Sequence, residues 1–370
     1  MGRGFLKVVV FEPRGDGGLC HYSYNLAMAL SQSGCEVTLL TDNRYELEAF
    51  PRSFEVVKFS LRSVAGIRGA LSWLRKNRPA IIHHQGTNLH PLFEYAFMKL
   101  SRIVSGAAYV YTCHLVTPHE DPGAERVFIR PKLAQCDAMI VHSQVTKKEA
   151  HDLYNLKDEH ISVIPHGNYK FFNQVKGLGK DIGWRKIEGT KDVLFFGAIR
   201  VYKGLSYLID ALALLRDKNV PVRLLIVGKP YEDWDSYVKQ IEEKKLGDHV
   251  LMSLGYVDIN DVPNYFAVAD AVCLPYLDGS ESGVLQLADA FDKPIIATET
   301  GGNLEAYEKG YVQALVPPKE SVSLAAAIEK VLFEMTPEQI AEQKLTRNDG
   351  SREWGPIAAT TIALYKKISR

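Results

Sequence analysis

The chain has 370 residues, which is long for one hydrophobic core and suits two domains. Its hydrophobic fraction of 46% is that of an ordinary globular protein, and its 44 basic and 44 acidic residues cancel, so no bulk field favours nucleic acid. Five scattered cysteines without a C-x-x-C pair predict buried thiols in a reducing compartment, and no apolar run approaches the roughly 18 residues of a membrane span. We therefore expect a cytoplasmic protein that binds no nucleic acid.

The first elements predict a βαβ unit with a glycine-rich loop. Residues 6–11, LKVVVF, are typical of a buried parallel strand, and the loop after them leads into an amphipathic helix. The glycine spacing departs from the dinucleotide-binding motif, because the third glycine would fall at Cys20, and this argues against an NAD-dependent dehydrogenase. Gly17 and Gly18 still let the backbone approach a ligand beside a helix N-terminus, unless the loop is only a tight turn.

Strand and helix patterns continue to alternate through the first half of the chain. We expect strands at 36–40, 80–84, 108–113, 137–141 and 161–164, and helices at 19–33 and 90–105. The inner face of the second helix is predicted to carry Phe93, Phe97, Leu100 and Val104. His114 ends one strand, where a polar side chain faces the ligand cleft of an open α/β sheet, unless it is only bonded to neighbouring backbone.

A basic segment within this half has two interpretations. Residues 71–78 carry Trp73 and three cations, and Lys99 and Arg102 follow on the next helix. These residues form either a solvated helix face or a basic amphipathic surface for anionic lipid, which would bring the protein to the inner face of a membrane as a peripheral component.

Residues 171–189 break the alternation with glycines and charges, and we interpret them as a linker between domains 1–170 and 190–350. A second α/β series follows, with strands at 192–197, 222–228, 250–254 and 311–316 and helices at 205–215, 234–245, 262–268 and 321–333. The final helix, 351–370, is expected to return to the first domain, with Trp354, Ile357, Thr361 and Ala363-Leu364 inward. The predicted fold is therefore α/β, with two doubly wound parallel sheets.

The second series centres on residues 272–305. A buried strand at 271–274 runs into a polar turn, then a helix whose apolar face has the helical period, then a strand at 294–297. Ser280 and Ser282 are helix-capping types. Polar groups gather at the carboxyl end of the strand, where free backbone N–H groups at a helix N-terminus favour an anion. These N–H groups belong to Gly283, Val284 and Leu285.

Five motifs in order resemble a family 4 retaining glycosyltransferase of the GT-B fold, which has two Rossmann-like domains facing across a cleft. They are the GDGG loop, YTCH, VIPHG, FFGAIRVYKG, and a Glu separated by seven residues from a second acid, Glu281-SGVLQLA-Asp289. The resemblance covers nearly the whole chain. It implies transfer of a sugar from a nucleotide-diphospho-sugar, such as a UDP- or GDP-sugar, to a saccharide or lipid-linked acceptor in polysaccharide or glycolipid biosynthesis.

The resemblance also assigns roles by position. Lys203 would hold the donor diphosphate, with Arg200 as its cationic partner, and Glu281 would contact the hydroxyls of the donor sugar. Asp289 would bind the ribose, although a Glu is common there and Asp is one methylene shorter. His114 completes the predicted catalytic set, and Gly17, Gly18 and Ser282 join the N–H groups of Gly283, Val284 and Leu285 as donor-binding residues.

Two cations and a helix N-terminus would stabilise a leaving diphosphate without a metal, and the resemblance implies front-side attack by the acceptor. The D-x-D letters at Asp233-Trp234-Asp235 are interpreted as a helix start instead of a metal site, so no cofactor is expected. Two alternatives stay open. One is a nucleotide-sugar 2-epimerase-like enzyme of the same fold, and the other is a catalytically silent binding protein.

Overall fold

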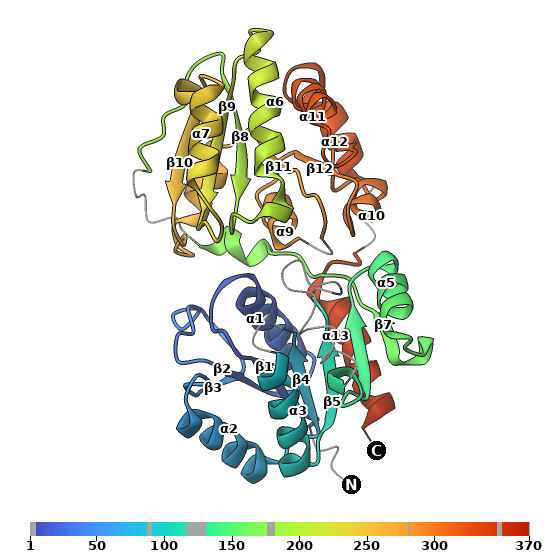
Figure 1. The fold of residues 1–370 in the computed structure, drawn as a ribbon. Coiled ribbons are helices and arrows are strands. Elements are labelled where there is room, and N and C mark those ends of the chain that lie inside the picture. Colours follow the sequence, from blue (N-terminus) through green and yellow to red (C-terminus); the bar gives the residue numbers. More distant parts are fainter. Residues whose placement is uncertain are drawn as a thin grey trace. The chain divides into compact units, whose positions relative to one another are not determined.

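The chain divides into two units in the computed structural model, which describes residues 5–86, 91–114, 116, 131–175, 182–279, 282–345 and 350–369 (Figure 1). Unit 1 comprises residues 1–167 together with 350–370, and unit 2 comprises residues 168–349. The described parts of the expected linker, 171–175 and 182–189, therefore group with unit 2. The last helix groups with unit 1.

The described part of unit 1 contains a seven-stranded parallel sheet in the order β3-β2-β1-β4-β5-β6-β7. The chain moves outward in opposite directions from β1 and β4, so their carboxyl ends form a switch point where ligands bind in open α/β sheets. The edge strand β3 was not anticipated. The strands are β1 Lys7–Glu12, β2 Glu36–Thr41, β3 Glu55–Lys58, β4 Ile81–Gln85, β5 Ala108–Thr112, β6 Ala138–Val141 and β7 Ile161–Val163.

Helices cover the two faces of this sheet. Side chains of α2, α3 and α5 join one hydrophobic cluster on the sheet, and α1 packs with α13. The described helices are α1 Gly17–Gln32, α2 Val64–Asn77, α3 Pro91–Ser105, α5 Gln144–Tyr154 and α13 Trp354–Ile368, with a short 3₁₀ turn at Asp158–His160.

The predicted inner faces of two helices were partly wrong. On α3, Leu100 is 45% exposed, while Glu94 points inward, because its carboxylate forms a buried ion pair with Lys132 at 2.8 Å. On α13, Ala363 is exposed and Tyr365 is fully buried, where its hydroxyl lies 2.5 Å from His83 Nδ1. In both helices a buried polar group that has a buried partner occupies an inward position. A search for apolar residues at helical spacing does not identify such a position.

The described part of unit 2 repeats the topology with six parallel strands in the order β10-β9-β8-β11-β12-β13, so its switch point lies between β8 and β11. The strands are β8 Lys191–Phe196, β9 Val222–Gly228, β10 Val250–Leu254, β11 Ala271–Leu274, β12 Ile295–Thr298 and β13 Ala314–Val316.

The helices of unit 2 include one 3₁₀ turn, η3 Val201–Lys203, that carries a predicted site residue. The others are α6 Leu205–Asp217, α7 Asp235–Glu243, α8 Val262–Val268, α9 Gly283–Ala290, α10 Asn303–Glu308, α11 Ser321–Glu329 and α12 Pro337–Leu345, with 3₁₀ turns at Lys170–Gln174 (η2) and Gly247–His249 and a π turn at Lys330–Glu334. Across the described parts of both units, none of the helices is both long and apolar enough to cross a bilayer.

Glycines bring the loops at the unit 2 switch point into direct backbone contact. A Cβ on Gly228 would lie 1.8 Å from the carbonyl oxygen of Gly197, and one on Gly204, which has φ +67°, would lie 2.0 Å from the carbonyl oxygen of Pro275. Side chains at these positions would push the loops after β8, β9 and β11 apart. The close approach therefore fixes the frame on which the site is built.

Tyr365→Phe should lower the free energy of unfolding by about 1–3 kcal/mol, because His83 loses a buried hydrogen-bond partner. The urea unfolding transition of unit 1 measures this change in free energy. Tyr95→Phe is the control, since the half-buried Tyr95 hydroxyl makes no hydrogen bond to the described residues. Equal stability of the two variants would show that the Tyr365 contact does not anchor α13.

Candidate functional site

A buried lysine lies at the switch point of unit 2. Lys203 ends η3 and is 7% exposed, although Lys side chains are rarely buried without a partner. It forms no ion pair with any residue that the structure describes. Burial, with the nearby Arg200 guanidinium as the second cause, lowers the pKa of the Lys203 ammonium to about 8. The site thus presents a desolvated cation with no counter-charge among the described residues.

The Lys203 ammonium lies beside the first turn of α9. A Cβ on Gly197 would be 3.1 Å from Lys203 Nζ and 3.4 Å from Val284 Cγ2, so both groups flank the same glycine. The ammonium also lies 5.5 Å from the centroid of the Tyr276 ring. The predicted proximity of the lysine to the helix N-terminus is therefore present within unit 2.

The side chain of the N-cap residue, Ser282, caps the first turn of α9. Ser282 accepts the Leu285 N–H through both its carbonyl oxygen, at 3.1 Å, and its hydroxyl oxygen, at 3.4 Å, and the hydroxyl also lies 3.0 Å from the Tyr276 hydroxyl. The Leu285 N–H is thus already engaged, which corrects the expectation that it is available for a donor. Gly283 and Val284 have no backbone N–H partner among the described residues, so they are the remaining candidates.

Arg200, the second predicted cation, lies just before η3. Its guanidinium stacks over the Tyr231 ring at 4.5 Å, and Lys229 approaches the same ring at 5.2 Å. Tyr231 is 49% exposed and comes soon after β9. Two cations and an exposed aromatic ring therefore gather at the carboxyl end of the sheet, near Lys203.

Of the two acids in the predicted motif, only Asp289 lies within the described residues. Glu281 and Ser280 lie outside the described residues. Asp289 is half-buried on α9. In the D-x-D letters, Asp233 accepts a hydrogen bond from the Asp235 N–H at 3.2 Å, at the start of α7.

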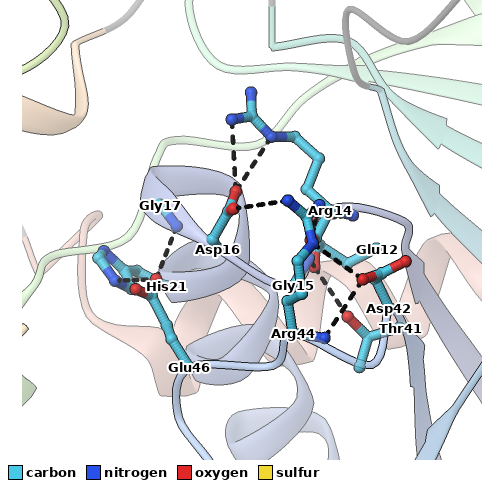
Figure 2. A network of polar contacts seen from close by, with 10 residues as sticks. All are labelled: Glu12, Arg14, Gly15, Asp16, Gly17, His21, Thr41, Asp42, Arg44 and Glu46. Atoms are coloured by element: carbon cyan, nitrogen blue, oxygen red, sulfur yellow. Dashed lines mark hydrogen bonds and ion pairs between the residues drawn. The ribbon is translucent and has the colours of Figure 1, made fainter. Parts of the chain in front are cut away.

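In unit 1 the glycine-rich loop is occupied by carboxylates of the chain itself (Figure 2). The Gly17 N–H, at the start of α1, donates to Glu46 Oε1 at 2.6 Å, and His21 Nε2 lies 2.8 Å from the same oxygen. An incoming phosphate would have to displace the Glu46 carboxylate from the helix N-terminus. This argues against the expected role of Gly17 in donor binding and gives no support to that of Gly18.

A second carboxylate fixes the shape of the same loop (Figure 2). Glu12, the last residue of β1, accepts hydrogen bonds from the N–H groups of Arg14 at 2.8 Å and Gly15 at 2.7 Å, and from the Thr41 hydroxyl at 3.0 Å. Burial raises the pKa of the Glu12 carboxyl to about 7, against the opposing effect of these donors. Glu12 therefore positions the loop through three donors that all point at one buried carboxyl group.

His114 joins a chain of side chains at the carboxyl edge of the unit 1 sheet. Its Nδ1 lies 3.2 Å from His142 Nε2, and its Nε2 lies 3.0 Å from Gln85 Oε1. His142 Nδ1 in turn lies 2.9 Å from the Ile164 carbonyl oxygen. The Tyr22 ring packs edge-on against His114, with centroids 4.7 Å apart.

The positions of the protons on His142 and His114 can be deduced from the Ile164 carbonyl. This carbonyl can only accept, so His142 carries its proton on Nδ1, and burial lowers the pKa of His142 to about 4, which keeps it neutral. His142 Nε2 is then an acceptor, so His114 must donate from Nδ1. Burial also lowers the pKa of His114 well below its usual value, so His114 is neutral and its Nε2 carries a lone pair.

The Gln85 amide must therefore turn its nitrogen toward His114. With the amide oxygen facing the His114 lone pair, two acceptors oppose each other, and Gln85 Nε2 is buried without a partner among the described residues. A 180° rotation of the amide removes the opposed acceptors and gives Gln85 Nε2 the His114 lone pair as its acceptor. Gln85 and His142 thus hold His114 in one tautomer.

Comparison with known proteins follows the same division of the chain. Residues 16–167 match the family described as Glycosyltransferase Family 4, and residues 190–334 match the family described as Glycosyl transferases group 1. The chain belongs to the family 4 type of group 1 glycosyltransferases. The expected family is thereby confirmed, and the boundary between the two matched ranges lies close to the boundary between the two units.

Individual relatives are distant. An uncharacterized glycosyltransferase of Methanocaldococcus jannaschii is 24% identical over 62% of this chain and 59% of its own length. A GDP-mannose:glycolipid 4-beta-D-mannosyltransferase of Xanthomonas campestris is 26% identical over 57% of this chain and 55% of its own. The chain thus spans less than two thirds of the length of either relative.

Among solved structures, HepE of Anabaena in complex with UDP and glucose is similar across 98% of this chain and 100% of its own, with a TM-score of 0.74 and 20% identity. Together with the two parallel sheets, this likeness confirms the GT-B fold.

Four polar residues of the candidate site regions were missed by sequence reasoning. Glu12 and Gln85 end strands, and His142 directly follows one, so the strand-end rule that found His114 would have found them as well. Glu46 gave no signal, because it lies in a loop 29 positions from the glycine it contacts.

Gln85→Glu should raise the pKa of His114, because a carboxylate facing its Nε2 favours the imidazolium. Histidine ¹⁵N NMR across pH measures the tautomer and the pKa, and wild-type His114 should show the Nδ1–H tautomer. Gln135→Glu, on a half-buried glutamine whose amide bonds elsewhere, is the control and should leave His114 unchanged. An Nε2–H tautomer in the wild type would contradict the assigned amide orientation.

Proposed function

We propose that the glycosyltransferase moves a sugar from a nucleotide-diphospho-sugar to an acceptor hydroxyl with retention of the anomeric configuration. The observation that carries the proposal is the buried Lys203 ammonium, which forms no ion pair with the described residues and lies beside the first turn of α9. A buried charge of this kind is costly until an anion joins it. A diphosphate supplies the required negative charge and accepts hydrogen bonds from the free N–H groups.

The chemistry follows from where charge develops. Breaking the bond between sugar and diphosphate leaves negative charge on the leaving group, and a preorganised cation stabilises that charge without reorganisation. Lys203 contributes a point charge, and Arg200, stacked on Tyr231, contributes a planar fork that matches phosphate oxygens. The acceptor attacks from the side of the leaving group, and the diphosphate assists by taking its proton. No metal is required by this scheme.

The donor and acceptor are proposed by class. The Xanthomonas relative is named for GDP-mannose and a glycolipid, and the Anabaena structure holds UDP and glucose, which supports a GDP- or UDP-sugar donor. We propose a saccharide or lipid-linked acceptor in polysaccharide or glycolipid biosynthesis, bound mainly by unit 1. An epimerase-like reaction would proceed without acceptor, and a silent binding protein would bind the donor without releasing nucleotide, so product analysis separates these alternatives.

Donor binding is tested by thermal stabilisation with UDP, GDP and their sugars in the presence of EDTA. A ligand at 100 times its dissociation constant adds about 2.7 kcal/mol of stability, which is measurable as a rise in melting temperature. Lys203→Ala should abolish the rise and lower turnover by about 10²–10³, by comparison with loss of one oxyanion-hole donor. Lys239→Ala, on an exposed lysine of α7, should retain both.

Unchanged stabilisation in Lys203→Ala would refute the diphosphate site. Loss of turnover in EDTA that Mn²⁺ restores would instead refute a metal-independent mechanism. Inversion of the anomeric configuration in the product, followed by NMR, would overturn retention.

The affinity for the nucleoside diphosphate should fall as pH rises through about 8. The Lys203 pKa is about 8 in the free protein and rises in the complex, so binding above pH 8 requires uptake of a proton. Affinity should therefore drop by about tenfold between pH 7 and pH 9, which calorimetry in two buffers of different ionisation enthalpy can measure. Lys203→Arg, which stays charged, should show little drop. An equal drop in Lys203→Arg would assign the titration to another group.

A further inference from the structure

A long segment of unit 1 is almost free of acidic residues. Residues 56–119 contain a single Asp or Glu, Glu94, against eight lysines and arginines. Glu94 is 1% exposed and pairs with Lys132 inside the unit, so it does not offset the charge of the surface. Because the whole chain has no net charge, this excess is a local property of the segment.

The excess lies on and directly beside two adjacent helices. α2 and α3 pack against each other and contribute to the same hydrophobic cluster on the sheet, so their outward sides face the same way from unit 1 (Figure 1). We call the exposed cations of this layer the basic face. It consists of Arg62, Arg68, Arg75, Lys76, Arg78 and Lys99.

The basic face carries charges that have no ionic partner within the described part of the chain. Other cations of the segment differ in this respect, since Lys58 pairs with Glu48 at 2.9 Å and Arg102 with Asp137 at 2.8 Å. The structure also corrects the surface expected from sequence, because Trp73 packs against the core instead of facing outward. Six cations are therefore available to a partner.

Exposed aliphatic side chains accompany these cations. On α3, Leu100 is 45% exposed and Ile103 is 67% exposed, and their spacing of three places them on one side of the helix, next to Lys99. Val64 at the start of α2 is 66% exposed. Isolated exposed aliphatics are ordinary, but aliphatic groups among unpaired cations match the boundary of headgroups and acyl chains in a bilayer.

We propose that the basic face, with Val64, Leu100 and Ile103, docks unit 1 onto a bilayer that contains anionic lipid. The cations contact lipid phosphates, and the aliphatic side chains enter the region between headgroups and acyl chains. A nucleic acid or another soluble polyanion would satisfy the cations but leave the aliphatic groups in water. The proposal is independent of the donor site, because docking is measured without any nucleotide-sugar.

Sedimentation of the full chain with vesicles tests the proposal. Binding should require phosphatidylglycerol in a phosphatidylcholine vesicle and should weaken as salt shortens the Debye length from about 10 Å at 0.1 M. The double variant R75E/K76E should lower the affinity at least tenfold. The matched control, K366E/K367E on α13, makes the same change in charge on a helix that packs with α1, and it should bind like the wild type.

Ile103→Asn, which removes the aliphatic side chain without changing the charge, separates insertion from pure charge attraction. It should weaken vesicle binding severalfold while heparin binding stays the same. An unchanged circular dichroism spectrum and melting temperature in all variants show that they are folded. Equal binding to pure phosphatidylcholine, equal loss in both double variants, or binding to heparin without binding to anionic vesicles would overturn the proposal.

Discussion

An ammonium group held out of water with no carboxylate beside it among the described residues is the constraint on which the unit 2 site depends. Burial disfavours the charged form of Lys203, so the packing of the surrounding loops must offset this cost in the free protein. The offset rests on backbone contact. Gly197, Gly204 and Gly228 let three strand-end loops touch, and any side chain at Gly197 would reach the ammonium itself. The ammonium is thus held at an electrostatic cost, and the close backbone contacts fix its position. This arrangement suits a group that must meet an anion in one position.

The two units share a topology but carry opposite charges in the loops that follow their first strands. Each has a glycine-containing loop after its first strand and a switch point beside it. In unit 1 the N-terminus of α1 already holds the Glu46 carboxylate, and Glu12 directs a second carboxyl group into the same loop. In unit 2 the corresponding loop, after β8, carries the buried Lys203 cation instead, beside the first turn of α9. Strand order therefore defines where a ligand can bind, while a few side chains decide the charge that each place accepts.

Sequence periodicity predicted most long elements to within a few residues, because apolar spacing reports burial directly. It failed where a polar partner reverses the pattern, as for Glu94 with Lys132 and Tyr365 with His83. Strand β3 was missed because its four residues, EVVK, are short and end in charges. In the site, Lys203 and Arg200 came from the family resemblance. The sequence did not show which backbone N–H groups are already hydrogen-bonded within the chain. Ser282 was recognised as a capping type, but only the structure shows that its hydroxyl accepts from the Leu285 N–H. The contact of Glu46 with the Gly17 N–H joins residues 29 positions apart.

The return of the last helix makes unit 1 discontinuous, and this orders events during synthesis. Unit 1 needs residues 350–370, so its sheet emerges from the ribosome long before α13 exists, while all of unit 2 emerges in between. At about 5–20 residues per second, the surface that receives α13 waits for roughly 10–40 seconds. During that interval His83 lacks the Tyr365 hydroxyl, and Gly167 lacks the Trp354 ring that later lies within 2.3 Å of its missing Cβ. Unit 2 can thus fold first, and a nascent chain halted before α13 leaves uncovered the surface of α1 on which α13 packs.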